Sequence, residues 1–214
     1  MLLRYSNRVT HQLAREFVDK AANATDPAVD SRDRIIDIVV EILETEGYDA
    51  VQLREVARRS RTSLATIYKR YPTRDHLILA ALESWMDEYR YAGLTRQHRD
   101  PDESVYDGMM RVLGTIFEPW ERHPEMLKAY YRSRSATGRE LLLHRGLDNV
   151  IPAAMEVLDG VDKDFVADLD TVLATLVFGL SGRFAAGEIA ITDILPTIER
   201  TVRWFITGYE ATRG

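Results

Sequence analysis

The sequence contains no cysteine, no apolar run that we expect to span a bilayer and no recognisable signal peptide. Without cysteine, disulfide bonds and thiolate metal sites are excluded, which suits a reducing cytoplasm. Arg4, Asn7, Arg8 and His11 interrupt the apolar region that a signal peptide would need. We therefore expect a cytoplasmic protein with no membrane partner.

Signatures of catalysis are also missing. The 5 histidines are scattered without an HExxH pair, and there is no glycine-rich phosphate loop or nucleophile elbow. No stretch alternates apolar and polar residues with a period of two, so we expect an all-α protein. We predict no metal and no cofactor, and an all-α enzyme is the least favoured alternative.

Charge is distributed unevenly along the chain. The 214 residues carry a formal net charge of -6, and the hydrophobic content of 45% is ordinary for a globular protein. A local basic island in an acidic chain indicates a polyanionic partner such as double-stranded DNA. This basic island lies in residues 52–75, where Glu55 and Asp75 are the only acidic residues. Its members are Arg54, Arg58, Arg59, Arg61, Lys69, Arg70 and Arg74.

Two short helices are predicted within this basic segment, separated by a polar turn at residues 58–62. Ser63 can cap the second helix, Pro72 should end it, and Thr73 can cap a third. Two short helices, a tight turn and a basic outer face predict a helix-turn-helix, whose second helix enters the major groove. Apolar residues recur at helical spacing on both sides of the turn, at Leu53, Val56 and Ala57 and at Leu64, Ile67, Tyr68 and Tyr71.

The string LREVARRSRTSLATIYKRYPTRDHLILAAL resembles the DNA-binding segment of TetR-family regulators over about residues 33–82. Arg61 and Thr62 depart from the pattern, because the family often has glycine and valine at these two positions. If the turn needs a positive φ, an arginine at position 61 is energetically unfavourable compared with glycine. The head and the long amino-terminal arm are also similar, more weakly, to actinobacterial TetR repressors of sterol and lipid catabolism. The residues that carry the main resemblance are Ala57, Ser63, Thr66, Tyr68, Tyr71, Thr73, Arg74 and Leu77.

The recognition helix should run from about Ser63 to Arg70. Its candidates for base contacts are Leu64, Ala65, Thr66 and Lys69. Phosphate contacts set the register without reading sequence, and the resemblance assigns them to the positions of Thr66, Tyr68 and Arg74. We add Ser63 and Thr73 to the phosphate-binding candidates, and we count Arg54 among the DNA-binding residues. For the arginines of the turn, solvated surface charge is the alternative interpretation.

We divide the chain into an arm (1–30), a helix-turn-helix head with its connecting helix (31–94), and a helical ligand-binding and dimerisation domain (95–214). Asp30 or Ser31 should start the first head helix, and Gly47 should end it in an αL cap. Pro119 should close one later helix, and Pro152 should kink or divide another.

The resemblance implies that the carboxyl-terminal helices form a ligand pocket and a dimer interface. Thioether and aromatic side chains adapt to irregular cavities, although each could equally fill the core. The pocket candidates are Met109, Leu113, Phe117, Trp120, Met126, Tyr130, Tyr131, Met155 and Phe178. The last two helices could form a four-helix interface across a two-fold axis through Leu169, Leu173, Leu176, Leu180, Ile198, Val202 and Phe205.

The resulting hypothesis is a homodimeric repressor that binds a palindromic operator and is released by a small apolar or amphipathic effector. A buried arginine would need an anion, so Arg132, Arg134 or Arg183 could hold an acidic or phosphate-bearing ligand such as an acyl-coenzyme A; ordinary salt bridges are the alternative. A helix-turn-helix protein with no small-molecule sensor is the second functional alternative.

Overall fold

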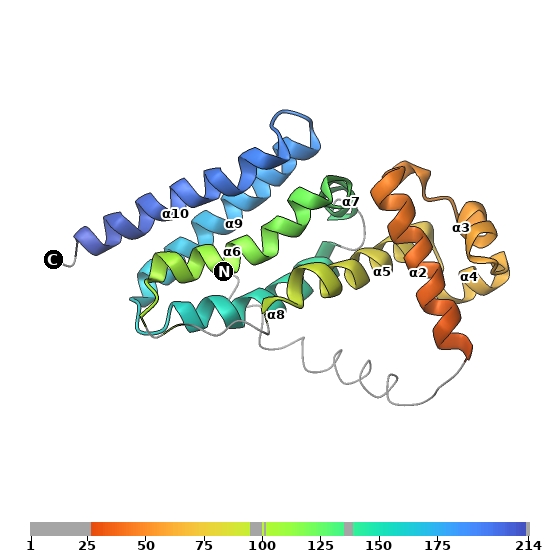
Figure 1. The fold of residues 1–214 in the computed structure, drawn as a ribbon, viewed down its shortest axis with the longest axis horizontal. Coiled ribbons are helices and arrows are strands. Elements are labelled where there is room, and N and C mark those ends of the chain that lie inside the picture. Colours follow the sequence, from red (N-terminus) through yellow and green to blue (C-terminus); the bar gives the residue numbers. More distant parts are fainter. Residues whose placement is uncertain (1–26, 95–99, 101, 135–138, 213–214) are drawn as a thin grey trace.

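The computed structural model describes residues 27–94, 100, 102–134 and 139–212, so residues 1–26 of the predicted amino-terminal arm lie outside it. Within these ranges the protein is built from helices alone, which confirms the predicted fold class. Figure 1 shows a small head of α2, α3 and α4 at one end, from which α5 leads into a group of longer helices. The helices are α2 (Pro27–Thr45), α3 (Leu53–Ser60), α4 (Leu64–Arg70), α5 (Arg74–Met86), α6 (Val105–Arg122), α7 (Pro124–Arg134), α8 (Arg139–Val157), α9 (Lys163–Ala185) and α10 (Ile194–Ala211).

The first helix of the head starts and ends differently from the prediction. It begins at Pro27, where the missing N–H is not needed in the first turn. It ends at Thr45, after which the N–H groups of Glu46 and Gly47 both donate to the Ile42 carbonyl, at 2.9 and 3.0 Å. Gly47 has φ 85° and ψ 176°, so its φ is positive but the predicted αL cap is wrong. This extended conformation with positive φ is open essentially to glycine alone.

Both predicted caps of the head are confirmed. The Ser63 Oγ accepts from the Thr66 N–H at 3.1 Å, and the Thr73 Oγ1 accepts from the His76 N–H at 3.2 Å. Tyr71, which precedes Pro72, is extended with φ -127° and ψ 93° and ends α4. Local side-chain chemistry therefore fixes where both helices start.

The connecting helix changes from an α-helix to a π-helical turn near its carboxyl-terminal end. α5 is followed without a break by the π-helical turn η3 (Asp87–Tyr91), which buries Arg90 and Tyr91. Single π turns inside helices are frequent at functional sites. Arg90 of this turn donates to the Ile116 carbonyl on α6, and the Tyr91 hydroxyl would lie 3.3 Å from a Cβ at Gly146 on α8.

α6 does not close at Pro119, and α8 is not divided at Pro152. α6 continues through Pro119 to Arg122, and α8 continues through Pro152 to Val157. A proline inside a helix removes one hydrogen bond and costs about 3 kcal/mol. The apolar face of α6, with Val112, Ile116 and Trp120 all buried, offsets that cost.

α9 is the most apolar helix of the described residues. It is long and apolar enough to cross a membrane by length and composition, with a mean hydropathy of 1.5, contrary to our expectation that no such stretch exists. The Gly182 position on α9 is packed closely against α7, where a Cβ would lie 2.7 Å from the Tyr131 hydroxyl. Only 22% of the apolar window is buried in the subunit, so much of α9 is left for another surface.

Candidate functional site

The turn between α3 and α4 has the left-handed geometry that favours glycine. Arg61 adopts φ 55° and ψ 36°, and no other non-glycine residue in the described ranges has a positive φ. The turn is closed by the Thr62 N–H, which donates to the Ala57 carbonyl at 3.0 Å. The arginine thus occupies the glycine conformation without displacing α4, which begins at Leu64, one residue after the predicted start.

α4 presents a solvent-facing side with little packing of its own. Ile67 anchors the helix in the core with no exposed surface, while Tyr68 is 52% exposed. Ala65 and Lys69 are exposed beside Tyr68, and Leu64 and Thr66 are half-buried. The Thr66 Oγ1 lies 2.8 Å from the Ser63 Oγ, so these two hydroxyls already bond to each other. The candidates for base contacts therefore lie on one face of a firmly seated helix.

Acidic residues neutralise part of the basic island. Glu55 binds Arg58 and Arg59 at 2.6 Å each, and Arg59 also binds Glu46 at 2.6 Å. Hydrogen bonds from Arg58 and Arg59 lower the pKa of Glu55 to about 2. For Arg58 and Arg59, the alternative interpretation as surface charges therefore fits better than a phosphate contact. Within the basic island, the exposed cations without an ion pair among the described residues are Arg54, Arg61 and Lys69.

The Arg74 side chain is occupied inside the head. Its Nε donates to the Val51 carbonyl at 2.6 Å, its Nη2 donates to the Tyr48 carbonyl, and its guanidinium lies 4.7 Å from the centre of the Tyr48 ring. These contacts tie the start of α5 to the short helix η2 (Tyr48–Ala50). The guanidinium predicted to contact phosphate instead holds the head together.

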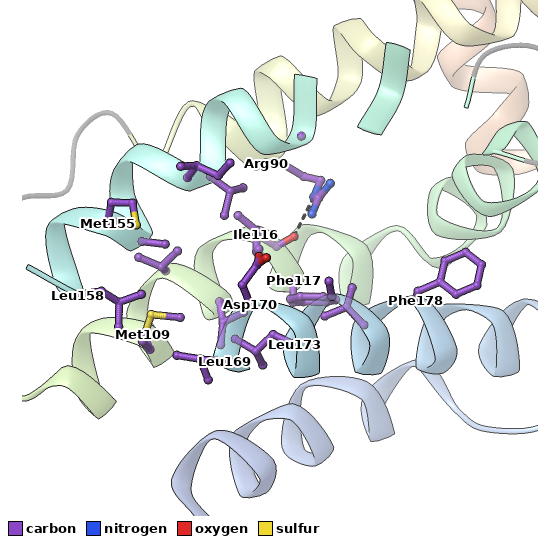
Figure 2. Close-up of a pocket in the computed structure, with 18 of the residues that line it drawn as sticks. Arg90, Met109, Ile116, Phe117, Met155, Leu158, Leu169, Asp170, Leu173 and Phe178 are labelled. Carbon is purple, nitrogen blue, oxygen red and sulfur yellow. Dashed lines mark hydrogen bonds between the residues drawn. The ribbon is translucent and has the colours of Figure 1, made fainter. Parts of the chain in front are cut away.

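A cavity of about 540 Å³ lies between η3, α6, α7, α8 and α9 (Figure 2). Its size falls in the range of small-molecule sites, about 300–1,000 Å³. The predicted pocket residues that line it are Met109, Leu113, Phe117, Tyr130, Met155 and Phe178.

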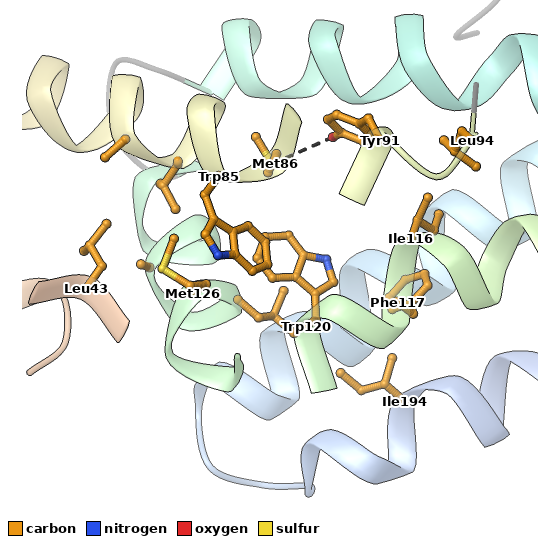
Figure 3. Close-up of a cluster of buried hydrophobic side chains, with 14 of the residues drawn as sticks. Leu43, Trp85, Met86, Tyr91, Leu94, Ile116, Phe117, Trp120, Met126 and Ile194 are labelled. Atoms are coloured by element: carbon orange, nitrogen blue, oxygen red, sulfur yellow. Dashed lines mark hydrogen bonds between the residues drawn. The ribbon is translucent and has the colours of Figure 1, made fainter. Parts of the chain in front are cut away.

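The other three pocket candidates do not line the cavity. Trp120 and Met126 are buried in an aromatic cluster between α5, α6 and α7 (Figure 3). Tyr131 packs against Gly182 and, at 5.7 Å between ring centres, against Phe178. We correct these three assignments, because the facing helices fill the space around each side chain.

Two charged residues that the sequence analysis did not assign to a ligand site line the cavity. Arg90 is 8% exposed, and Asp170 lies on the α9 wall. Burial raises the pKa of the Asp170 carboxyl. A sequence signal existed for Arg90, since it follows Met86 by four residues on the apolar side of the connecting helix.

Two of the three arginines that we considered for an anionic ligand, Arg132 and Arg183, form salt bridges at the surface. Arg132 binds Asp49 with both terminal nitrogens at 2.8 Å, and Arg183 binds Glu188 at 3.1 Å. The side chain of Arg134 lies outside the described residues. Arg132 also stacks 4.3 Å from the centre of the Tyr48 ring, so it joins α7 to the head.

An aromatic stack joins the cavity wall to the first head helix (Figure 3). The Arg90 guanidinium lies 4.5 Å from the centre of the Trp120 ring, and Trp120 stacks on Trp85 with 4.8 Å between ring centres. The Trp85 indole N–H donates to the Glu44 carboxylate on α2 at 3.0 Å, and His123 contacts the same carboxylate at 2.8 Å. These contacts form one continuous chain of packed groups.

Most of the predicted dimer-interface residues lie inside the subunit. Leu169, Leu180, Ile198 and Val202 are between 0% and 7% exposed. They pack into the subunit's own core and cannot contact a partner in this conformation, so these four assignments are wrong. Leu173, Leu176 and Phe205 are half-buried and pack against that core.

Comparison with known proteins decides the family. A model described as bacterial regulatory proteins of the tetR family matches residues 35–81, and one described as tetracyclin repressor-like, C-terminal domain, matches residues 103–205. The chain belongs to the TetR family. Family members are transcriptional regulators rather than enzymes, and this chain is a DNA-binding transcriptional regulator.

Curated relatives and solved structures agree with this assignment. The chain is 28% identical over 179 residues to the HTH-type transcriptional repressor KstR of Rhodococcus jostii, covering 80% of each chain. It is 27% identical to KstR of Mycolicibacterium smegmatis, covering 82% of this chain and 86% of that protein. A TetR transcriptional regulator from Rhodococcus sp. RHA1 has a similar fold, with a TM-score of 0.63 at 21% identity over 84% of this chain and 96% of that one.

Proposed function

We propose that this TetR-family protein is a cytoplasmic homodimeric repressor that binds a near-palindromic operator and is released by a small apolar or amphipathic effector. One recognition helix reads only a few base pairs, and a second copy on a matching half-site supplies the remaining specificity. Similarity to repressors named KstR supports repression as the direction of regulation.

The DNA-contacting surface of this proposal is the outer side of α4 with its neighbouring cations. Lys69 and Tyr68 project from α4, Arg54 from α3, and Arg61 from the turn between them. Lysine and arginine contacts to phosphate fix the register of the protein on the duplex, and the α4 side chains then meet base edges. Arg74 acts indirectly, because its contacts to Val51 and Tyr48 hold α5 against the rest of the head.

The proposed subunit interface is the exposed face of α9 and α10. Phe178 is 44% exposed and Trp204 is 70% exposed, and large apolar side chains of this kind favour contact with a partner. Exposed small residues accompany them, including Ala174 and Gly179 on α9 and Gly208 on α10. A two-fold axis beside these helices would bring the same face of each subunit together.

The position of the cavity is the observation that carries the proposed regulation. Arg90 and Tyr91 line the cavity and belong to η3, which continues directly from α5. The beginning of α5 is held against the head by Arg74, and its carboxyl-terminal end contacts α2 through Trp85 and Glu44. A ligand that binds one position of η3 more tightly therefore favours one position of the head.

Selection of DNA fragments from the source genome tests the proposal. The purified chain should retain a fragment carrying an inverted repeat, with two subunits bound to each duplex. Gly179→Arg should reduce dimer formation and operator binding, since a Cβ at Gly179 meets nothing within 4 Å and the subunit can fold. Ser84→Arg, at an exposed site on α5, is the matched control for dimer mass. A wild-type chain that is monomeric in ultracentrifugation and retains no genomic duplex at low salt would contradict the proposal.

A regulator without a small-molecule sensor is the second candidate. In that case the cavity would be a packing feature, and operator binding would not respond to any metabolite. A thermal-shift screen followed by operator-release assays separates the two, because an effector that binds the folded protein raises its melting temperature.

A further inference from the structure

Arg90 is a buried cation on the wall of the cavity. It is 8% exposed and belongs to the π-helical turn η3. Burial of a guanidinium is costly unless an anion balances its charge. In the portion of the chain that the structure describes, Arg90 forms no ion pair with a carboxylate.

The groups around Arg90 are neutral. Its Nε donates to the Ile116 carbonyl at 2.9 Å (Figure 2), and its Nη1 lies 3.3 Å from the Tyr91 hydroxyl and 3.7 Å from the Met86 sulfur. The face of the guanidinium lies over Trp120 at 4.5 Å. These contacts orient the cation, and none of the hydrogen bonds involves the Arg90 Nη2 atom. The arrangement holds a positive charge in a fixed position without neutralising it.

Asp170 does not serve as the counter-ion. It lines the same cavity from α9, yet it forms no ion pair with Arg90. Burial raises the pKa of the Asp170 carboxyl. Apolar side chains make up most of the remaining wall, with Met109, Met155 and Leu158 grouped together away from Arg90 in Figure 2.

We propose that the effector is an apolar carboxylic acid whose carboxylate binds the Arg90 guanidinium and whose hydrocarbon part fills the cavity. This inference rests on the proposed function, because it names the chemical class of the effector at that site. A guanidinium donates charge-assisted hydrogen bonds to a carboxylate, and such bonds are about twice as strong as neutral ones. The carboxylate supplies the missing negative charge, and the apolar wall excludes ligands that are charged throughout.

Binding at Arg90 also reaches the aromatic stack. The guanidinium that would hold the carboxylate lies on Trp120, which stacks on Trp85. Occupation of the site therefore alters the environment of two buried indoles, and tryptophan fluorescence reports it directly.

The test uses matched ligands of equal chain length and the full chain. Octanoate, dodecanoate and hexadecanoate are each compared with the corresponding alcohol, and dodecyl phosphate is compared with dodecanoate. Dissociation constants come from tryptophan fluorescence for the wild type and for Arg90→Met, Arg90→Lys and Asp170→Asn. Arg122→Met, at an exposed arginine of α6 outside the cavity, is the control variant.

At least one acid should bind the wild type roughly 10- to 100-fold more tightly than its alcohol, the range expected for a hydrogen bond to a charged group. Arg90→Met should abolish this preference and keep the affinity for the alcohol, whereas Arg90→Lys should retain part of it. Asp170→Asn and Arg122→Met should retain the preference. If Arg90→Met does not fold, the wild-type comparison of acid with alcohol decides the question.

Equal affinity of acids and alcohols, no binding of any acid, or an unchanged preference in folded Arg90→Met would overturn the inference. Tighter binding of dodecyl phosphate than of dodecanoate would overturn the assignment of a carboxylate. Operator binding is measured on the same samples. A chain that binds its operator but prefers no acid refutes only this inference, whereas a chain that prefers acids but binds no duplex refutes the proposed regulator.

Discussion

The head and the carboxyl-terminal helices use apolar side chains in different ways. In the head, Ile35, Val39, Ile42 and Ile67 have no exposed surface, so the small core is closed. Beyond η3, the helices enclose a cavity of about 540 Å³, and most of the apolar window of α9 is not buried in the subunit. A DNA-binding domain needs one rigid shape, whereas a ligand-binding and dimerisation domain needs apolar surface that remains available for its ligand and its partner.

The contrast predicts unequal costs for similar substitutions in the two regions. Ile67→Ala removes a fully buried side chain that seats α4, so the free energy of unfolding should fall by about 2–5 kcal/mol. Met155→Ala, at a cavity-lining residue that is 42% exposed, should cost less than about 1 kcal/mol. Urea denaturation measures both. Equal losses would show that the cavity region is packed as tightly as the head.

The aromatic stack is where the two regions meet, and Trp85→Phe tests its role. The variant loses the hydrogen bond to Glu44 and some packing, so stability should fall by about 1–2 kcal/mol. Effector affinity should change little, but release from the operator should need more effector, because the link to α2 is weakened. Unchanged release by Trp85→Phe would remove the stack from the mechanism.

On the DNA side, the difference between free and paired cations can be tested with Lys69 and Arg58. Lys69→Ala should weaken operator binding by about 1 kcal/mol and reduce the salt dependence by about one phosphate contact if Lys69 binds phosphate. Arg58→Ala should change both less, since Glu55 already holds Arg58 at 2.6 Å. Affinities measured over a series of salt concentrations give both quantities. A larger salt effect from Arg58 would reverse our assignment.

Much of the head could be predicted because its rules are local. Ser63 and Thr73 cap the helices that follow them, and Pro72 ends the helix before it, from side-chain chemistry within three residues. α6 and α8 continue past Pro119 and Pro152 because long-range packing of these helices outweighs a local cost. Helix boundaries are therefore least predictable where a helix has much tertiary contact.

The cavity and the interface depend on which helices face one another, and periodicity does not contain that information. Met109 and Met126 are similar side chains on neighbouring helices, yet the first lines the cavity and the second is core. Ile198 and Val202 form a regular apolar stripe that packs on the subunit itself, while the exposed Trp204 lies beside it on the same helix. A helix with two apolar faces gives no local sign of which one meets a partner.

Arg61 is the one position of the head where sequence and conformation disagree, so it offers the smallest and most local test. A non-glycine residue in αL costs roughly 1–2 kcal/mol, while glycine loses about 0.4–1 kcal/mol more chain entropy on folding. Arg61→Gly should therefore raise the free energy of unfolding by about 0.5–1 kcal/mol, whereas Arg61→Ala should leave it nearly unchanged.

The same pair of variants separates backbone strain from DNA contact at this turn. Both remove an exposed cation, so operator affinity should fall equally in Arg61→Gly and Arg61→Ala if the guanidinium contacts phosphate. Only the glycine variant should gain stability, because only glycine relieves the positive φ. Thermal unfolding and operator binding at matched salt measure the two effects independently. A loss of affinity confined to Arg61→Gly would mean that rigidity of the turn, rather than its charge, supports DNA binding.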